Sequence, residues 1–152
     1  MPKNLQIGND IYEYPVQSDG NWGEEATAWA EAVTDSLANV QGANDILITS
    51  SNLNNNQVAP TDIAGLAFST SSVLSIQLEF FVKRDASSVF TESGILSANF
   101  DGSDWKTVQE SVGDSGVIFT ITPSGQVQYT STNLASHVSS SVRYRAKTID
   151  SP

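Results

Sequence analysis

The sequence has no cysteine and only one histidine, His137. Without cysteine, the chain can form no disulfide, hold no thiolate-bound metal and use no cysteine nucleophile. A single histidine also excludes a metal site built from several imidazoles. We therefore expect no cofactor and no metal. The 152 residues are enough for one domain with an appendage, and for a hydrophobic core that needs no covalent staples.

Long apolar runs are missing as well. No stretch approaches the roughly 20 apolar residues that a membrane helix needs. Polar sequence follows Met1-Pro-Lys-Asn4, where a signal peptide would have its apolar segment. We expect a soluble chain that is made in a cytoplasm and does not insert into a membrane.

Positive charge is scarce in the first half of the chain. Residues 1–82 contain one basic and ten acidic residues, whereas residues 83–152 contain six basic and seven acidic ones, and the formal net charge is −10. Phosphate binding requires a footprint of lysine and arginine, so this distribution argues against a nucleic-acid partner. An acidic surface suits a basic partner or, more simply, a soluble exterior.

One segment has the apolar spacing of an amphipathic helix. Its apolar positions recur every 3.6 residues on average and are Trp22, Ala26, Trp29, Val33, Leu37 and Val40. Asp19 or Asn21 can cap its start, and Gly42 can end it. The opposite face carries the acidic residues Glu24, Glu31 and Asp35. A helix of about 18 residues is too short to be stable alone. It must pack either on its own β domain or on other copies of the chain, and both remain open.

Three segments are expected on this basis. Residues 1–45 form an N-terminal arm and helix for attachment or oligomerisation, in which Ile11 to Val16 forms an edge strand or an unpaired arm because Pro15 cannot donate to a sheet. Residues 46–62 form an Asn-rich linker. Residues 63–152 form an antiparallel β domain.

The β domain is predicted from a hydrophobic period of two. Between Val73 and Arg84 the expected buried face is Leu74, Ile76, Leu78, Phe80 and Val82. Further strands are expected at 94–100, 105–109, 116–122, 126–130 and 142–149, with a hairpin turn at Pro123-Ser-Gly125. The fold class is therefore mainly β: an antiparallel β-sandwich or small barrel, preceded by an extended arm and one amphipathic N-terminal helix.

Few residues favour catalysis. His137 lies in Leu134-Ala-Ser-His-Val138, which lacks the pattern of a nucleophile elbow, so we expect a surface or packing role for it. Asp101-Gly-Ser-Asp104 resembles part of a calcium loop, but it lacks the alternating ligands and the terminal glutamate, and we expect a β-turn. We expect no enzymatic activity.

Other residues are better candidates for interfaces. Trp22, Trp29, Val33 and Leu37 on the helix are expected to pack against the β domain or against other subunits. Arg143, Arg145 and Lys147 alternate along one strand and could pair with acidic neighbours, although a solvated strand face, or a sheet edge protected against aggregation, is the simpler interpretation. Trp105 could contribute to ligand binding, but core packing is favoured for it.

Several segments resemble small virion proteins of tailed bacteriophages. Gly20-Asn-Trp-Gly-Glu24, which opens the alanine-rich helix, is similar to segments near the N-termini of such proteins. The second half resembles a β domain of the same group in five places: Lys83-Arg84, Glu92-Ser-Gly94, Gly113-Asp-Ser-Gly-Val117, Gly125-Gln-Val-Gln-Tyr-Thr-Ser131 and Tyr144-Arg-Ala-Lys-Thr-Ile149. The resemblance covers most of residues 20–149, and its motifs are not chemically diagnostic.

The resemblance implies a structural role on the phage particle. It implies a non-enzymatic bacteriophage virion protein on the particle exterior, such as a capsid decoration or cement protein, a head fibre or a tail-fibre segment, often a homotrimer. Its partners would be other copies of the chain and virion proteins such as the major capsid or tail proteins. The alternative, which Trp105 motivates, is a carbohydrate-binding module of the tail fibre or baseplate that recognises a host surface glycan.

Overall fold

The structure is a computed structural model that describes residues 4–7, 10–13, 22–40, 42 and 44–150. The chain divides into two compact units, residues 1–43 and residues 44–152. The first contains the strands β1 (Asn4–Ile7) and β2 (Asp10–Glu13) and the helix α1 (Trp22–Val40). The second contains eight strands: β3 (Ile46–Asn52), β4 (Thr61–Ala67), β5 (Val73–Asp85), β6 (Val89–Phe100), β7 (Trp105–Gly113), β8 (Val117–Ile121), β9 (Gln126–Ser131) and β10 (Ser139–Asp150).

The N-terminal unit is a hairpin beside a helix. β1 and β2 pair antiparallel, from Asn4 with Glu13 to Ile7 with Asp10. The segment expected to be an edge strand or an unpaired arm is therefore paired locally as far as Glu13, and α1 contacts both strands. On α1, Ala32 is buried, Trp29 and Val33 are half-buried, and Glu24 and Glu31 are exposed. The predicted apolar and acidic faces are thus confirmed for these positions, whereas the side chains of Trp22, Asp35, Leu37 and Val40 lie outside the described residues.

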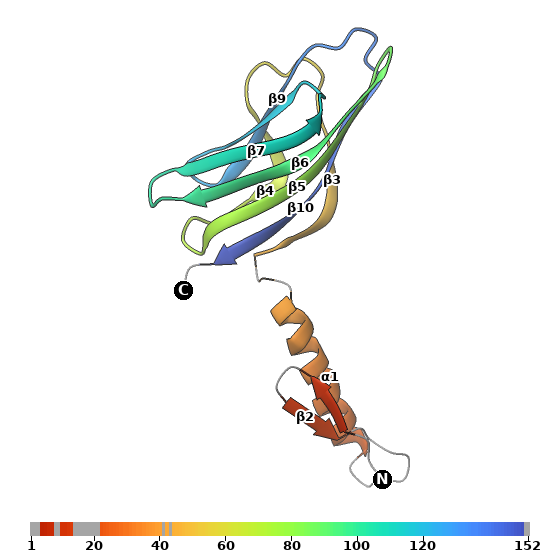
Figure 1. The fold of residues 1–152 in the computed structure, drawn as a ribbon, viewed down its shortest axis with the longest axis vertical. Coiled ribbons are helices and arrows are strands. Elements are labelled where there is room, and N and C mark those ends of the chain that lie inside the picture. The colour runs from red at the N-terminus through yellow and green to blue at the C-terminus, as the bar shows by residue number, and fades with distance from the viewer. Residues whose placement is uncertain (1–3, 8–9, 14–21, 41, 43, 151–152) are drawn as a thin grey trace. The chain divides into compact units, whose positions relative to one another are not determined.

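The β unit is a sandwich of two antiparallel sheets. One sheet has five strands in the order β3-β10-β5-β6-β7, and the other has three in the order β4-β9-β8 (Figure 1). Their inner faces share one hydrophobic core, in which the rings of Phe80 on β5 and Phe119 on β8 lie 4.9 Å apart between centroids. Of the two predicted architectures the sandwich is confirmed, because within residues 44–150 the two sheets do not close into a barrel.

The alternation along β5 is confirmed with one shift. Ile76, Leu78, Phe80 and Val82 are buried as predicted. Leu74 was expected beside them and is instead 38% exposed, while Val73 is fully buried. The cause is an irregularity in the pairing with β10, where Ser75 pairs with Ile149 but Val73 pairs with Asp150. A bulge of this kind reverses the face on which the preceding residues project.

The predicted linker is largely structured. Ile46–Asn52 forms β3, which pairs antiparallel with β10 at the edge of the five-stranded sheet. The polar run Thr49-Ser-Ser-Asn52 has no alternation of apolar and polar residues, so the sequence pattern did not predict a strand here. An edge strand needs few apolar side chains. The asparagines that follow hold loops together: Asn54 N donates to Tyr129 Oη at 2.8 Å, and Asn55 Oδ1 accepts from Leu134 N at 2.9 Å.

Other strands extend beyond their predicted limits. β6 begins at Val89 rather than at Gly94, and β7 continues to Gly113. The hairpin of β8 and β9 turns at Gly125 as expected, with a φ of 89°. A side chain there would overlap the carbonyl oxygen of Phe68, which explains why glycine occupies the position.

Candidate functional site

The outer face of the five-stranded sheet gathers the exposed positive charge of the β unit. The structure describes all of residues 44–150, and this range contains six basic residues. Arg84 is fully buried. The other five are Lys83, Lys106, Arg143, Arg145 and Lys147, and all of them project from the outer face of this sheet. We call this surface the cationic face.

Strand pairing explains how residues from distant parts of the sequence converge there. Val142, Tyr144 and Ala146 of β10 are buried, so Arg143, Arg145 and Lys147 point outward, as predicted. The cross-strand pairs Arg143↔Phe81, Arg145↔Glu79 and Lys147↔Gln77 place this row beside the outward residues of β5. Lys106 on β7 faces the same way because its neighbour Trp105 is buried.

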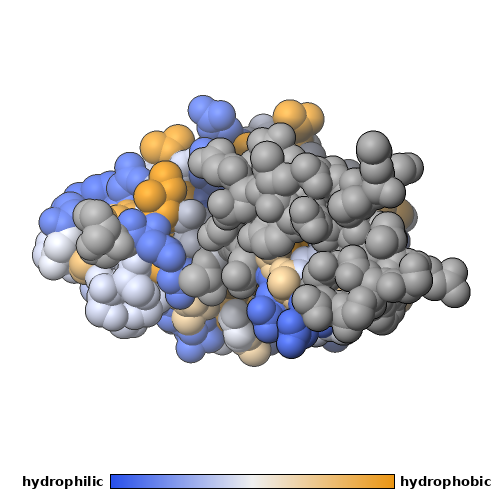
Figure 2. All heavy atoms as spheres, turned by 90° about the horizontal axis from the view of Figure 1, so that it is seen from below, coloured by the Kyte–Doolittle hydropathy of each residue, from blue (hydrophilic) through white to orange (hydrophobic). Residues whose placement is uncertain are grey.

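Exposed hydrophobic residues interleave with these cations. Among them are Ile48 (56% exposed), Phe81 (44%), Ile95 (42%), Val108 (62%) and Val112 (80%). They belong to four strands of the sheet, and pairing brings Phe81, Ser93 and Val112 into one cross-strand row. Hydrophobic and hydrophilic residues are also interspersed on the described surface that is seen from below (Figure 2). A face that combines apolar side chains with arginine has the composition of a protein interface.

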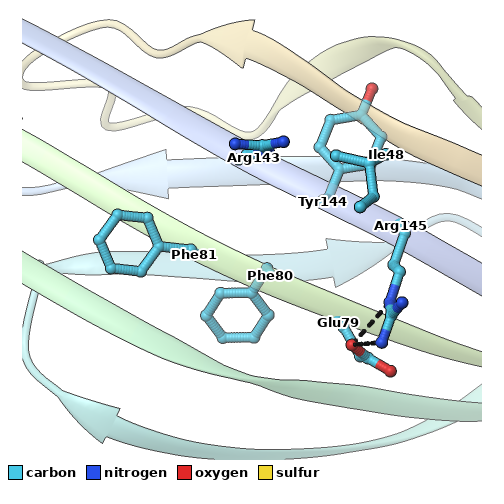
Figure 3. A pocket seen from close by; sticks show the side chains of 7 residues that line it. All are labelled: Ile48, Glu79, Phe80, Phe81, Arg143, Tyr144 and Arg145. Atoms are coloured by element: carbon cyan, nitrogen blue, oxygen red, sulfur yellow. Dashed lines mark hydrogen bonds and ion pairs between the residues drawn. The ribbon is translucent and has the colours of Figure 1, made fainter.

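The cations of this face differ in how they are neutralised. Arg145 donates from Nε to Glu79 at 2.8 Å and lies 2.7 Å from it through Nη2 (Figure 3). Lys83 lies 3.0 Å from Asp85, and Lys106 lies 3.2 Å from Asp101. Arg143 and Lys147 form no ion pair with any residue between 44 and 150. These two positive charges are therefore available to a partner.

Arg143 borders a shallow groove between β3, β10 and β5. The groove has a volume of about 260 Å³ and is lined by Ile48, Glu79, Phe80, Phe81, Arg143, Tyr144 and Arg145 (Figure 3). Phe81 and Ile48 supply apolar surface on either side of the Arg143 guanidinium. The groove can therefore accept a group that carries both a negative charge and apolar atoms.

Trp105 does not belong to this surface. It is only 5% exposed and packs against Phe100, with ring centroids 5.3 Å apart. Core packing, the interpretation favoured from the sequence, is confirmed. The same burial argues against the suggested ligand-binding role of Trp105, because a sugar stacks on an exposed ring face and the ring of Trp105 is buried.

Arg84 joins three loops and the start of β10 at one end of the sandwich. All five of its N–H groups donate hydrogen bonds: Nε to Ser140 Oγ (3.1 Å), Nη1 to Ser115 O (2.7 Å) and Thr132 Oγ1 (3.2 Å), and Nη2 to Asn55 Oδ1 (2.7 Å) and Thr132 O (2.7 Å). Burial lowers the pKa of this guanidinium. Arg84 was not predicted to have a role, although continuing the alternation of β5 from Val82 places it on the inner face.

Glu92 and His137 are part of the same polar end. Glu92 Oε2 accepts from the N–H and the hydroxyl of Ser115, at 3.1 and 2.6 Å. His137 Nε2 lies 2.8 Å from Ser140 Oγ, the atom that also accepts from Arg84. His137 is half-buried and Ser140 is buried, so this contact connects a loop to β10. The expected packing role fits this arrangement.

The Asp101 turn is a β-turn, as predicted. Asp101 Oδ1 accepts from the N–H groups of Ser103 (3.0 Å) and Asp104 (2.9 Å) and from the Ser103 hydroxyl. These hydrogen bonds hold the pKa of the Asp101 carboxyl well below its usual range; the one from Asp104 contributes most, followed by those from Ser103 and then by Lys106.

Among the described residues, no three His, Asp or Glu side chains are grouped so that they could hold a metal ion. No helix in the described part of the chain is long and apolar enough to cross a membrane.

Comparison with known proteins gives a weak structural likeness to a phage protein. No model of a protein family matches the sequence, and no curated protein is similar to it. The tailspike protein of Acinetobacter phage vB_ApiP_P1 is similar in fold to 67% of this chain, with 12% sequence identity and a TM-score of 0.47. The matched region is 22% of the tailspike chain. A likeness at this level assigns neither a family nor a function.

Proposed function

We propose that this chain is a non-enzymatic structural protein on the exterior of a tailed-phage virion, a capsid decoration or fibre protein that acts as a homotrimer. The observation that carries the proposal is the cationic face, where exposed Ile48, Phe81 and Ile95 lie among arginines and lysines. A monomeric protein gains nothing from exposing such a surface, whereas a protein that assembles buries it against a neighbour. The resemblance of the sequence to small virion proteins supports a phage particle as the assembly.

The division of the chain into two units supports the same proposal. The N-terminal unit, residues 1–43, has its own contacts between helix and hairpin, and the sandwich of residues 44–152 has its own core. A chain that combines a small unit with a separate β domain suits a protein in which one part attaches and the other is displayed. In this arrangement Trp29 and Val33 help to hold the attachment unit together.

Two measurements test the proposal together. Light scattering coupled to size exclusion gives the solution mass at micromolar concentration, and antibody labelling in electron microscopy locates the protein on purified particles of the phage that encodes it. We expect a mass of three chains and label on the particle surface. A monomer that is absent from the particles contradicts the proposal.

A further inference from the structure

The cationic face is an unusual surface in an acidic chain. Its strand residues carry five cations and three carboxylates, Glu79, Asp85 and Glu110, a formal charge of +2 in a chain of −10. The loop residues Asp101 and Asp104 offset Lys106 at one edge of the face, so the positive charge without an ion pair within residues 44–150 lies on β10. Residues 1–43 have seven acidic residues and one basic residue, a formal charge of −6. The cationic strand face and the acidic segment thus lie in different units of the same chain.

We propose that the cationic face binds the acidic N-terminal unit of a neighbouring copy, with the outer side of α1 seated on β10 and β5. The inference rests on the proposed function, since it requires that copies associate. It identifies the surface through which they do so.

The exposed side of α1 suits this role chemically. Ala32 is buried and Trp29 and Val33 are half-buried, so the apolar side of the helix is already used within its own unit. Glu24, Ala28 and Glu31 are exposed and lie on the opposite side, since residues four and seven apart recur on one helical face. Two carboxylates are therefore presented with a small side chain between them, which lets the helix approach a surface closely.

The charge spacing on the two surfaces is similar. Glu24 and Glu31 are seven residues apart, about 10 Å along a helix axis. Arg143 and Lys147 are four residues apart, about 13 Å along a strand. Side-chain flexibility covers the difference, so both carboxylates can reach the two cations that lack an ion pair within the β unit.

A charge swap in the full-length chain tests the inference. The face variant is Arg143→Glu/Lys147→Glu, and the helix variant is Glu24→Lys/Glu31→Lys. Solution mass is measured by light scattering for the wild type, for each variant, for their equimolar mixture and for the fourfold variant. All four positions are exposed, so we expect the substitutions to leave each chain folded. Circular dichroism and the thermal midpoint of unfolding check this for every variant.

We expect each variant alone to fall to the mass of a monomer at a concentration where the wild type assembles. The mixture should recover a mass above that of the monomer, since the unchanged helix of one variant fits the unchanged face of the other and the two reversed surfaces also match. A closed ring of three keeps one mismatched contact, so this recovery should be partial. The fourfold variant should assemble for the same reason.

Three results overturn the inference. If both variants keep the wild-type mass, the copies associate elsewhere, and the proposed function stands without this interface. If the fourfold variant assembles but the mixture stays monomeric, the helix contacts the face of its own chain. A wild type that is itself monomeric and absent from phage particles overturns both the inference and the proposed function.

Discussion

The two sheets of the sandwich have similar inner faces and different outer faces. Inside, both contribute aromatic and branched side chains to one core, from Phe80 and Val142 on one sheet to Phe119 and Val127 on the other. Outside, the five-stranded sheet carries every exposed cation of residues 44–150, whereas β4, β8 and β9 contain no lysine or arginine. The need to form a core limits which residues can occupy the inner faces. The different residues on the two outer faces therefore indicate a role in binding.

On the outer face of the three-stranded sheet, glutamine side chains form hydrogen bonds within that sheet. Gln128 Nε2 donates to Asp62 Oδ1 at 2.7 Å across β9 and β4. Gln126 Nε2 donates to the carbonyl oxygens of Ile63 and Leu66, where the pairing of β4 with β9 is irregular. Its polar groups thus bond to neighbouring strands, while Arg143 and Lys147 on the other sheet make no ion pair within residues 44–150. This contrast predicts that substitutions on the two outer faces affect association differently.

The largest expected effect concerns the polar end where the two sheets meet. Arg84→Met should lower the free energy of unfolding by about 3 kcal/mol or more, because the buried carbonyl of Ser115 loses its donor and four further hydrogen bonds of the guanidinium are lost. Arg84→Lys should lose less, since lysine keeps the charge and three of the five donors. Urea unfolding followed by fluorescence measures both. If the Met variant is within 1 kcal/mol of the wild type, roughly the worth of one hydrogen bond, the loops do not depend on Arg84.

The next effect separates the two faces of one strand. Phe80 is 4% exposed and its neighbour Phe81 is 44% exposed. Phe80→Ala should cost about 3–5 kcal/mol of stability because it leaves a cavity in the core. Phe81→Ala should change stability by about 0.5 kcal/mol or less, but should weaken self-association. Urea unfolding and light scattering on the matched pair give both quantities. Equal losses of stability would show that the outer face also contributes to folding.

The smallest effect is a pH dependence at the edge of the five-stranded sheet. The pKa of Asp101 is depressed in the folded state, so its carboxylate stabilises the fold fully above the unfolded pKa of about 4. This contribution is lost as the pH falls through the folded-state value. Asp101→Ala should therefore lower the thermal midpoint at neutral pH, and its difference from the wild type should narrow below about pH 4. A difference that stays constant on acidification would contradict the assigned role of the carboxylate.

The sequence predicted most of the sandwich, and the reasons for its failures are physical. Alternation in β5 and β10 identified the inner faces, and it also placed Arg143, Arg145 and Lys147 outside. β3 was missed because its polar residues lie at a sheet edge, and Leu74 was misplaced because a bulge in pairing leaves no mark in a local pattern. The cationic face as a whole could not be predicted, since bringing Lys83 and Lys106 beside β10 depends on strand order.

The central claim is that copies of the chain associate through the cationic face and not through the other outer face. The most direct measurement is the solution mass by light scattering for two variants that change the net charge equally. Arg143→Gln/Lys147→Gln neutralises the cationic face, and Ala64→Glu/Thr120→Glu alters exposed positions of the three-stranded sheet. We predict that the first variant is monomeric at a concentration where the wild type and the second variant assemble. Equal masses for the two variants would contradict the claim.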